Sequence, residues 1–413
     1  MRFVRERIQI NNQPLSEEVF AKYLFETWDR LEASAKAAGH RDPSSPETKP
    51  VYFRFLTLMA FHCYISEGVD TAVIECGIGG EYDSTNILVR PSVTAVTSLG
   101  IDHTAMLGDT IESIAWHKAG IFRPGVPAIT APQPESASQV LKERAAEKQT
   151  QLHVVSIHPD LDNVKLGLAA DFQKVNASVA IAAANAFLRQ SRSLNPETIQ
   201  SIDQRLPESF RAGLENVRLG GRCETREDTK SNLSWYIDGG HTLESIEMAG
   251  RWFASLISTT YISTAPKRIL IFNQQTRDAN ALARKLHSTL SSAVTGSGHH
   301  PFTHAIFCTN TTYTDGGFKP DLTSINTNSA DIEALSVQNA LAQTWAEIDP
   351  WADVKVVRTV EEAVAFARSV AGARSVQGSG SDDEVKVLVT GSLHLVGGVL
   401  EVLEAETEKD GNS

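Results

Sequence analysis

The chain has 413 residues, of which 41% are hydrophobic and 21% are charged, a composition typical of a globular protein large enough for two or three cores. Its formal net charge of −12 excludes the strongly basic footprint of a nucleic-acid-binding protein. Four scattered cysteines without a Cys-x-x-Cys pair argue against a disulfide framework and a structural zinc site. No apolar run approaches the roughly 18 residues of a membrane span.

The first part of the sequence alternates between helical and strand-like patterns. Helices are predicted over about residues 16–39, 52–66, 110–119 and 172–189. Short β-branched runs that end in glycines or polar residues predict buried parallel strands at 70–76, 93–99 and 127–130. Strands that alternate with helices indicate an open parallel sheet covered on both faces.

The alternation starts afresh at Trp235, which predicts a second, Rossmann-like α/β domain. Strands are expected near 234–238, 268–272, 304–308, 354–357 and 385–390, and helices near 243–257, 278–290, 332–346, 360–371 and 396–405. The predicted division is a first domain over 1–191, a linker over 192–220 and a second domain over 221–413.

Polar side chains follow the predicted strands of the first domain. Glu75 ends one strand and precedes a glycine-rich loop, His103 follows the next strand, and Lys118 lies on the next helix. Because the carboxyl ends of parallel strands form the ligand-binding edge of such sheets, these groups could converge on a site for Mg²⁺ and phosphate. In the alternative interpretation, Glu75 caps a turn and His103 is a polar loop residue.

Three segments of the second domain have the same ambiguity. Asp238 ends a strand and could hold a ribose hydroxyl, or it could, like Thr242, cap the following helix. Arg222 could pair with a phosphate or be a solvated surface group. The turn at Gly391-Ser392 could bind an anion through backbone N–H groups or simply connect a strand to a helix.

The glycine-rich segment is not a phosphate-binding loop. Gly77-x-Gly79-Gly80 matches neither G-x-x-x-x-G-K-[ST] nor G-x-G-x-x-G, and the first of these motifs occurs nowhere in the 413 residues.

Taken together, these segments resemble the folylpolyglutamate synthase family of the Mur ligase superfamily, in its eukaryotic, fungal form. The resemblance runs in order from about residue 2 to residue 403. Its motifs are Val4-Arg-Glu-Arg-Ile8, Tyr52-Phe-Arg-Phe-Leu-Thr57, Glu75-Cys-Gly-Ile-Gly-Gly80-x-Tyr-Asp83-x-Thr-Asn86, Thr97-Ser-Leu-Gly-Ile-Asp-His103, Ile114-Ala-x-x-Lys118-Ala-Gly-Ile, Asn176-Ala, Asp238-Gly-x-His241-Thr and Val389-Thr-Gly-Ser-Leu-His394-Leu-Val-Gly-Gly398.

The resemblance implies an ATP-dependent ligase that adds L-glutamate to the γ-carboxylate of tetrahydrofolyl-(poly)glutamate through an acyl phosphate. It also implies a Mur-ligase-type ATPase domain followed by a Rossmann-like ligase domain. Glu75 and His103 would be magnesium ligands, and Lys118 would be the lysine that carries a carbamate.

The remaining implied roles concern nucleotide and glutamate. Asn176, Arg222 and Asp238 would contact ATP. His241, a catalytic candidate, would lie with Ser392 and His394 on the side of the incoming glutamate.

The sequence departs from the family pattern at several positions. The family's Trp-Pro-Gly-Arg reads Leu219-Gly-Gly-Arg222, and Phe172 replaces a histidine. The largest departure is the lack of the family's opening strand and its Gly-Thr-x-Gly-Lys-Gly-Ser loop. We therefore expect the chain as written to be inactive as a ligase and poorly stable, with apolar surface exposed around Thr71–Ile74. A paralogue that binds folate or partners without turnover and a dihydrofolate synthase are the alternative interpretations, although Tyr52–Thr57 favours the polyglutamylating branch.

The resemblance also sets expectations for partners and location. The expected ligands are tetrahydrofolate polyglutamates, L-glutamate, ATP and Mg²⁺, with K⁺ or another monovalent cation as an additional cofactor. A monomer is expected, in the cytoplasm and with mitochondria as a second location.

Overall fold

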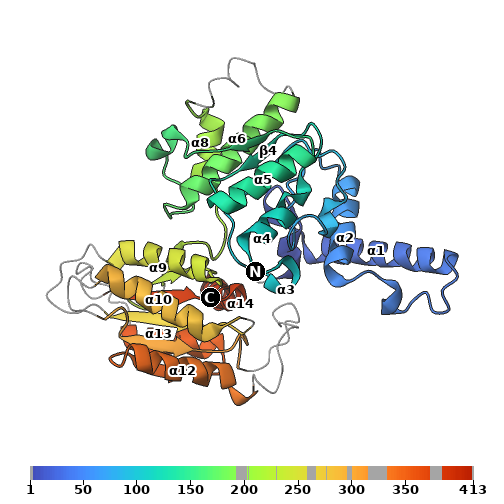
Figure 1. Ribbon diagram of the computed structural model, residues 1–413. Helices are drawn as coiled ribbons and strands as arrows, with labels where there is room; N and C mark the ends of the chain where they lie inside the picture. The colour runs from blue at the N-terminus through green and yellow to red at the C-terminus, as the bar shows by residue number, and fades with distance from the viewer. Residues whose placement is uncertain are drawn as a thin grey trace. The chain divides into compact units, whose positions relative to one another are not determined.

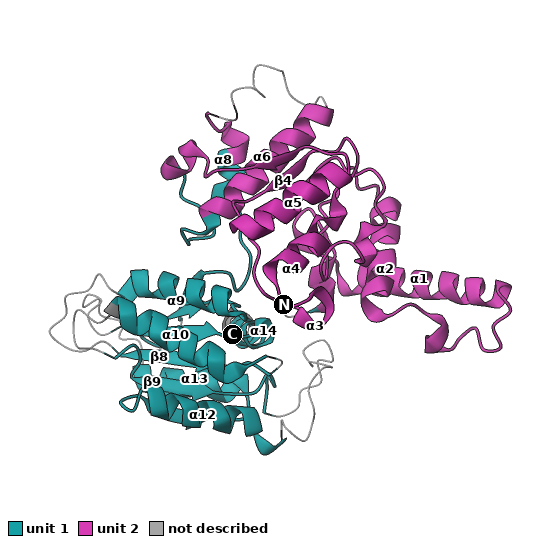
Figure 2. Ribbon diagram, in the orientation of Figure 1, with its two compact units in different colours: residues 1–3, 164–173, 211–413 teal, residues 4–163, 174–210 magenta. Residues whose placement is uncertain are grey.

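The computed structural model describes residues 3–191, 202, 204–228, 230–257, 267–275, 277–294, 300–314, 333–372 and 384–411. The chain divides into two compact units (Figure 2). Unit 2 comprises residues 4–163 and 174–210, and unit 1 comprises residues 164–173 and 211–413 together with the first three residues. Both units are α/β structures, as the sequence predicts.

Unit 2 begins with a small hairpin and two long helices (Figure 1). Strands β1 (Gln9–Ile10) and β2 (Gln13–Pro14) pair antiparallel, and helices α1 (Glu17–Ala37) and α2 (Tyr52–Ser66) follow. The Ser16 hydroxyl caps α1 by accepting a hydrogen bond from the Val19 N–H at 3.2 Å. The two helices share an apolar core that contains Tyr23, Met59 and Cys63.

The remainder of unit 2 is a parallel three-stranded sheet with helices. The strand order is β3 (Thr94–Val96), β4 (Ala128–Thr130), β5 (Leu152–Val154). The accompanying helices are α3 (Thr104–Leu107), α4 (Ile111–Lys118), α5 (Glu135–Glu147) and α6 (Gln173–Ser191). The predicted sequence pattern did not include α5 or β5.

The strand predicted over residues 70–76 is wrong for the described structure. These residues pair with none of the described strands. Val73 is 96% exposed and Thr71 is also exposed, so the apolar, β-branched pattern of a buried strand is present without a neighbour to bury it. This matches the expectation of exposed apolar surface at Thr71–Ile74.

Unit 1 contains a six-stranded sheet with the order β10-β9-β8-β11-β7-β6. Its strands are β6 (Glu224–Glu227), β7 (Leu233–Ile237), β8 (Arg268–Phe272), β9 (His304–Phe307), β10 (Asp353–Val356) and β11 (Val385–Thr390). All neighbours are parallel except β6, which pairs antiparallel with β7 at one edge. The five parallel strands fall where the sequence predicts them, whereas β6 was not predicted.

Helices cover both faces of the unit 1 sheet, as in a doubly wound fold. Helices α9 (Leu243–Ile257), α10 (Ala279–Val294) and α12 (Ser336–Ile348) bury one face with a core that includes Trp252, Phe272 and Trp345. Helices α13 (Val360–Ala371) and α14 (Leu393–Gly411) bury the other. Because β11 is inserted between β8 and β7, the chain leaves neighbouring strands toward opposite faces there.

Residues 164–173, which fall inside the predicted first domain, belong to unit 1. Ala170 and Phe172 pack into the core formed by α9, α10 and α12, and the Gly167 N–H donates to the Leu214 carbonyl at 2.9 Å. Of the predicted linker over 192–220, residues 192–201 and 203 lie outside the described residues, and α8 (Glu208–Asn216) is the short helix expected there. The exact domain limits at 191 and 221 remain predictions.

Candidate functional site

The glycine-rich loop of unit 2 is organised by the carboxylate of Asp83. One of its oxygens accepts the Ile78 N–H at 2.9 Å, and the other accepts the Thr85 N–H at 2.9 Å and the Thr85 hydroxyl at 2.6 Å. These bonds join the start of the loop to the short 3-10 helix Ser84–Ile87. Asp83 is therefore engaged in shaping the loop.

The glycines of this loop allow a close approach to the end of α4. A Cβ atom at Gly80 would lie 2.7 Å from the His117 carbonyl oxygen and 2.8 Å from that of Lys118. Gly79 has a φ of +70°, which L side chains rarely adopt. The glycines thus seat the loop on the turn that carries Lys118, a role different from cradling a phosphate.

Cys76 directly follows Glu75 and is only partly exposed. Burial is the main cause that raises the pKa of the Cys76 thiol. The charges of Asp83, Lys118 and Glu75 have smaller effects on this pKa. Glu75 itself is exposed. The structure places the loop that follows Glu75 on the turn that carries Lys118, and a meeting of the two side chains stays a prediction.

His103 lies at the N-terminus of α3 in a strained conformation. Its φ of 54° and ψ of 37° are left-handed, which costs a non-glycine residue conformational energy. Its backbone N–H donates to Asp102 Oδ1 at 2.8 Å, and its Nε2 lies 3.6 Å from Asp102 Oδ2. Leu107 of the same helix lies against Gly79, so α3 borders the glycine-rich loop.

A magnesium ion at this edge would have few protein ligands. Across the described parts of the chain, no three His, Cys, Asp or Glu side chains are grouped as a metal site. Mg²⁺ usually keeps several waters and takes only one or two carboxylates. The exposed carboxylate of Glu75 could supply one such oxygen, and the imidazole of His103 would be a less usual second ligand.

In unit 1, Asp238 occupies the end of β7 beside the inserted strand β11. Its carboxylate is buried and accepts the Cys223 N–H and the Gly240 N–H, both at 2.9 Å. Burial raises the pKa of this carboxyl, against the lowering effects of those bonds and of the nearby Arg222. Asp238 thus ties the Arg222 turn to the end of β7, and Cys223 adopts a left-handed φ of 46°.

The residues after Asp238 cap α9. Thr242 Oγ1 accepts the Ser245 N–H at 3.2 Å, while Ser245 Oγ accepts the N–H groups of His241 and Thr242 at 2.9 Å. His241 Nδ1 lies 2.9 Å from the Gly239 carbonyl oxygen. Thr242 therefore caps helix α9, as in the alternative interpretation of its role. The contact with the Gly239 carbonyl fixes the orientation of the His241 imidazole.

Ser392 has a similar local role at α14. Its hydroxyl accepts the His394 N–H at 3.2 Å and is 3.5 Å from the Leu395 nitrogen. Ser392 is buried and His394 is exposed. The strand–helix connection is thus capped by its own serine.

Side-chain amides at the carboxyl ends of β8 and β9 form a row of hydrogen bonds that was not predicted from the sequence. Gln338 donates to Asn273 at 2.9 Å, Asn273 donates to Asn310 at 2.8 Å, and Asn310 donates to Gln275 at 3.1 Å. Gln274 also donates to the Gly391 carbonyl at 2.8 Å. The three consecutive amides at residues 273–275 directly after a predicted strand were the available signal.

Comparison with known proteins identifies the family. Folylpolyglutamate synthase of Saccharomyces cerevisiae strain S288c is 45% identical over 405 residues, which cover 98% of this chain and 70% of that protein, and the enzyme of strain YJM789 matches equally well. No family model matches the chain. The chain belongs to the folylpolyglutamate synthase family.

Solved structures show the same fold. Folylpolyglutamate synthase of Mycobacterium tuberculosis, crystallised with ADP and AMPPCP, has a TM-score of 0.67 at 21% identity, and the comparison covers 97% of this chain and 82% of that one. E. coli FolC in complex with ADP has a TM-score of 0.66 at 22% identity, covering 98% and 80%.

Folylpolyglutamate synthases are ATP-dependent ligases that add glutamate to folates, and this is the function of the family to which the chain belongs. The residues to which the family resemblance assigns roles are divided between the two units. Unit 2 contains Glu75, His103, Lys118 and Asn176, and unit 1 contains Arg222, Asp238, His241, Ser392 and His394. Asn176 is in the first turn of α6 and is partly buried.

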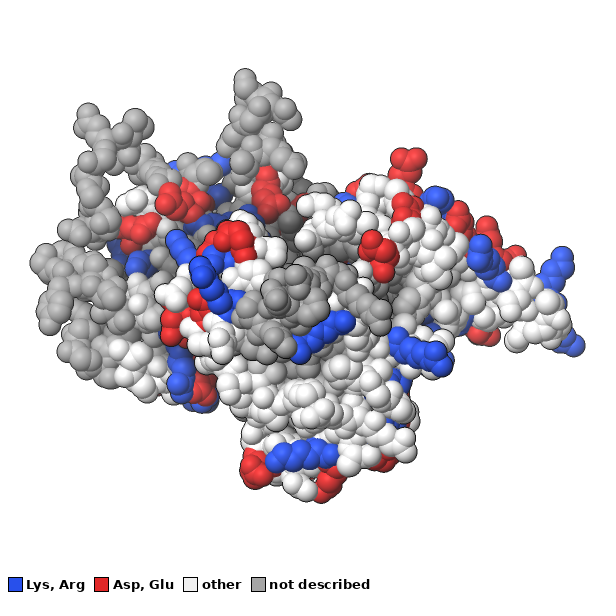
Figure 3. Space-filling model, turned by 90° about the horizontal axis from the view of Figure 1, so that it is seen from above, with Lys and Arg blue, Asp and Glu red and all other residues white. Residues whose placement is uncertain are grey.

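On the face drawn in Figure 3, Lys and Arg side chains are scattered among acidic and uncharged residues. No helix within the described residues is long and apolar enough to cross a membrane.

Proposed function

We propose that this chain uses Glu75, His103 and Lys118 to hold Mg²⁺ for the transfer of phosphate from ATP to the terminal γ-carboxylate of tetrahydrofolyl-(poly)glutamate. The amine of free L-glutamate then attacks the acyl phosphate, and an amide forms with loss of phosphate. The observation that supports the proposal is the packing of the glycine-rich loop, which follows Glu75, on the backbone carbonyls of His117 and Lys118, in a chain 45% identical to yeast folylpolyglutamate synthase.

The physical problem in this reaction is the approach of like charges. A folate carboxylate must come close to the triphosphate, and a bound Mg²⁺ would neutralise negative charge there. Glu75 would supply an oxygen ligand. Lys118, as a carbamate, would supply another, which accords with its position at the end of α4 against the glycine-rich loop.

In unit 1, Arg222 and Asp238 are proposed to contact the nucleotide, with Asn176 of unit 2. The contacts of Asp238 support an indirect contribution, because its carboxylate holds the turn that carries Arg222. His241, Ser392 and His394 are proposed to serve the incoming glutamate, since they surround the strand ends where α/β sheets bind ligands.

The test is incorporation of labelled glutamate into tetrahydrofolate with ATP and Mg²⁺. We expect little turnover from the 413 residues alone, because they contain no G-x-x-x-x-G-K-[ST] loop. We expect clear turnover when the family's strand–loop–helix segment is joined to the N-terminus, and its loss with Glu75→Gln or Lys118→Met. Turnover that survives both substitutions would contradict the assigned roles.

Three further expectations belong to the proposal. K⁺ or another monovalent cation should stimulate turnover, the protein should sediment as a monomer, and a fluorescent fusion should localise to the cytoplasm with a fraction in mitochondria. A strictly extracellular fusion or an obligate dimer would contradict the corresponding expectation.

A further inference from the structure

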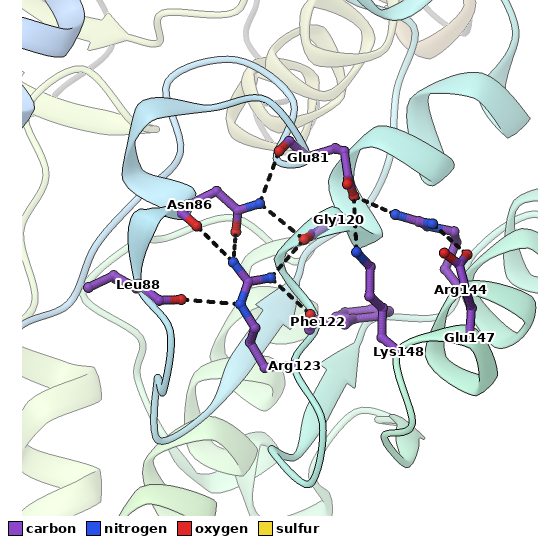
Figure 4. A network of polar contacts seen from close by, with 9 residues as sticks. All are labelled: Glu81, Asn86, Leu88, Gly120, Phe122, Arg123, Arg144, Glu147 and Lys148. Carbon is purple, nitrogen blue, oxygen red and sulfur yellow. Dashed lines mark hydrogen bonds and ion pairs between the residues drawn. The ribbon is translucent and has the colours of Figure 1, made fainter.

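A buried arginine on α5 contacts the glycine-rich loop at Glu81, next to the residues assigned to the metal. Arg144 pairs with the Glu81 carboxylate, and Lys148 Nζ lies 3.5 Å from the same oxygen (Figure 4). The Arg144 side chain is 5% exposed and that of Glu81 is 21% exposed. A pair shielded from water to this extent constrains geometry more than an exposed pair does.

The backbone of Glu81 is fixed to α4 at the same point. Its N–H donates to the His117 carbonyl at 2.8 Å, one residue before Lys118. A Cβ atom at Gly120 would lie 2.4 Å from Glu81 Cα, so the chain after α4 also packs tightly on this residue. Glu81 therefore joins three segments: the glycine-rich loop, the end of α4 and α5.

Arg144 also contacts α4 directly. Its guanidinium lies over the Trp116 ring, 4.3 Å from the ring centroid, and its Nη1 lies 2.5 Å from Glu147 Oε2 on the solvent side. Arginine can stack on an aromatic ring while forming ion pairs in its own plane, which lysine does less well. One guanidinium thus bridges the helix of Lys118 and the loop of Glu75.

We propose that Arg144 is a positioning residue that, through Glu81, holds the Glu75 loop against the Lys118 end of α4. The inference rests on the proposed metal role of Glu75 and Lys118. Groups that orient metal ligands typically change metal affinity by about 10–100-fold when they are replaced.

Cys76 provides a readout of this seating that does not depend on metal. It lies next to Glu75 and near Lys118 and is partly exposed, whereas Cys63, Cys223 and Cys308 are buried. Its rate of reaction with a disulfide reagent should rise when the loop separates from α4. Mn²⁺ binding, followed by electron paramagnetic resonance, gives the second readout.

The experiment uses the full chain with Arg144→Met, Arg144→Lys and Glu81→Gln, and Glu147→Gln as the matched control. Glu147→Gln removes the other ion pair of Arg144, which does not touch the loop. We expect Arg144→Met and Glu81→Gln to accelerate Cys76 modification and to weaken Mn²⁺ binding by about 10-fold or more. Arg144→Lys should be intermediate, and Glu147→Gln should behave as the unsubstituted chain. The double variant Arg144→Met/Glu81→Gln should modify Cys76 no faster and bind Mn²⁺ no more weakly than Arg144→Met alone, because both substitutions remove the same ion pair.

Unchanged Cys76 reactivity and Mn²⁺ affinity in both Glu81→Gln and Arg144→Met would overturn the inference, even if thermal stability fell. If Arg144→Met does not fold, Glu81→Gln, which keeps the size of the side chain, decides alone. Glu75→Gln separates the two claims. If it leaves Mn²⁺ binding intact while Arg144→Met still exposes Cys76, the metal role fails and the positioning role stands.

Discussion

The backbone N–H of Cys223 donates a hydrogen bond to the buried carboxylate of Asp238 at 2.9 Å, across the edge where β6 and β7 pair. The second carboxylate oxygen accepts the Gly240 N–H. A residue that the sequence presents as a nucleotide contact therefore also holds together two turns of unit 1. Substitutions at Asp238 should affect stability as well as catalysis.

Replacing Asp238 by alanine should lower the free energy of unfolding by about 1–3 kcal/mol, because buried N–H donors lose their acceptor. Asp238→Asn should lose less, since an amide oxygen can accept one of the bonds. Chemical denaturation at several pH values measures both.

The pH dependence has a definite sign. Burial raises the pKa of Asp238, so its contribution to stability is present below the ordinary carboxyl pKa and is lost as the pH rises through the folded value. The free energy of unfolding of Asp238→Asn should therefore increase relative to that of the unsubstituted protein as the pH rises above about 4. The opposite trend would mean that hydrogen bonding outweighs burial.

Replacing Gly80 by alanine should destabilise unit 2 by about 1–3 kcal/mol, because the added methyl group meets backbone carbonyls of α4 that cannot rotate away. Gly213 in α8 is the matched control, since a Cβ there meets nothing within 4 Å. Gly213→Ala should stabilise by about 0.5–1 kcal/mol, the helix preference for alanine. Equal losses at both positions would contradict the close-packing argument.

The sequence was most informative where side chains repeat with a clear period. The parallel strands of unit 1 contain continuous apolar runs such as Ile269–Phe272 in β8. These runs are buried on both faces of the sheet, so every position in them is apolar. The edge strand Glu224–Glu227 consists of polar residues and gives no such signal. Helix α5 was missed for a related reason, because its buried face includes Arg144 among small residues.

The candidate site residues also differ in whether a sequence pattern could identify them. Asp238 could be identified because chain order places it at the end of a strand, on a ligand-binding edge. Glu75 was singled out by the same argument from a predicted strand that the described structure does not form. The partners of those residues could not be identified in this way. Glu81 and Arg144 are 63 positions apart, and nothing local in either segment indicates that they pair.

Replacing Asp349 by asparagine should stabilise unit 1 above neutral pH. This carboxylate at the end of α12 is fully buried and lies 3.8 Å from the His287 imidazole and 3.5 Å from the His300 imidazole, with the Trp351 backbone N–H beside it. Burial raises the pKa of Asp349 and lowers the pKa of His287, so burial opposes the charged form of both groups. The stability contributed by Asp349 is lost as the pH rises through its folded pKa.

Thermal unfolding of Asp349→Asn between pH 5 and pH 8 checks this sign. The advantage of the variant should be largest at pH 8 and should shrink as the pH falls and the Asp349 carboxylate takes up a proton. A variant that is less stable at pH 8 would show that the carboxylate makes net favourable contacts.

Replacing Val73 by lysine should slow aggregation without changing the free energy of unfolding by more than about 0.5 kcal/mol. Val73 is 96% exposed in a β-branched run that pairs with none of the described strands, and such an edge can pair with the same segment of another molecule. A charge on that edge opposes pairing between chains.

Val51, which is 74% exposed but precedes helix α2, is the matched control. Light scattering during incubation at 37 °C should show slower aggregation for Val73→Lys than for Val51→Lys. Equal slowing by both would indicate a general effect of charge, and the extended segment at residues 71–76 would not be the site of association.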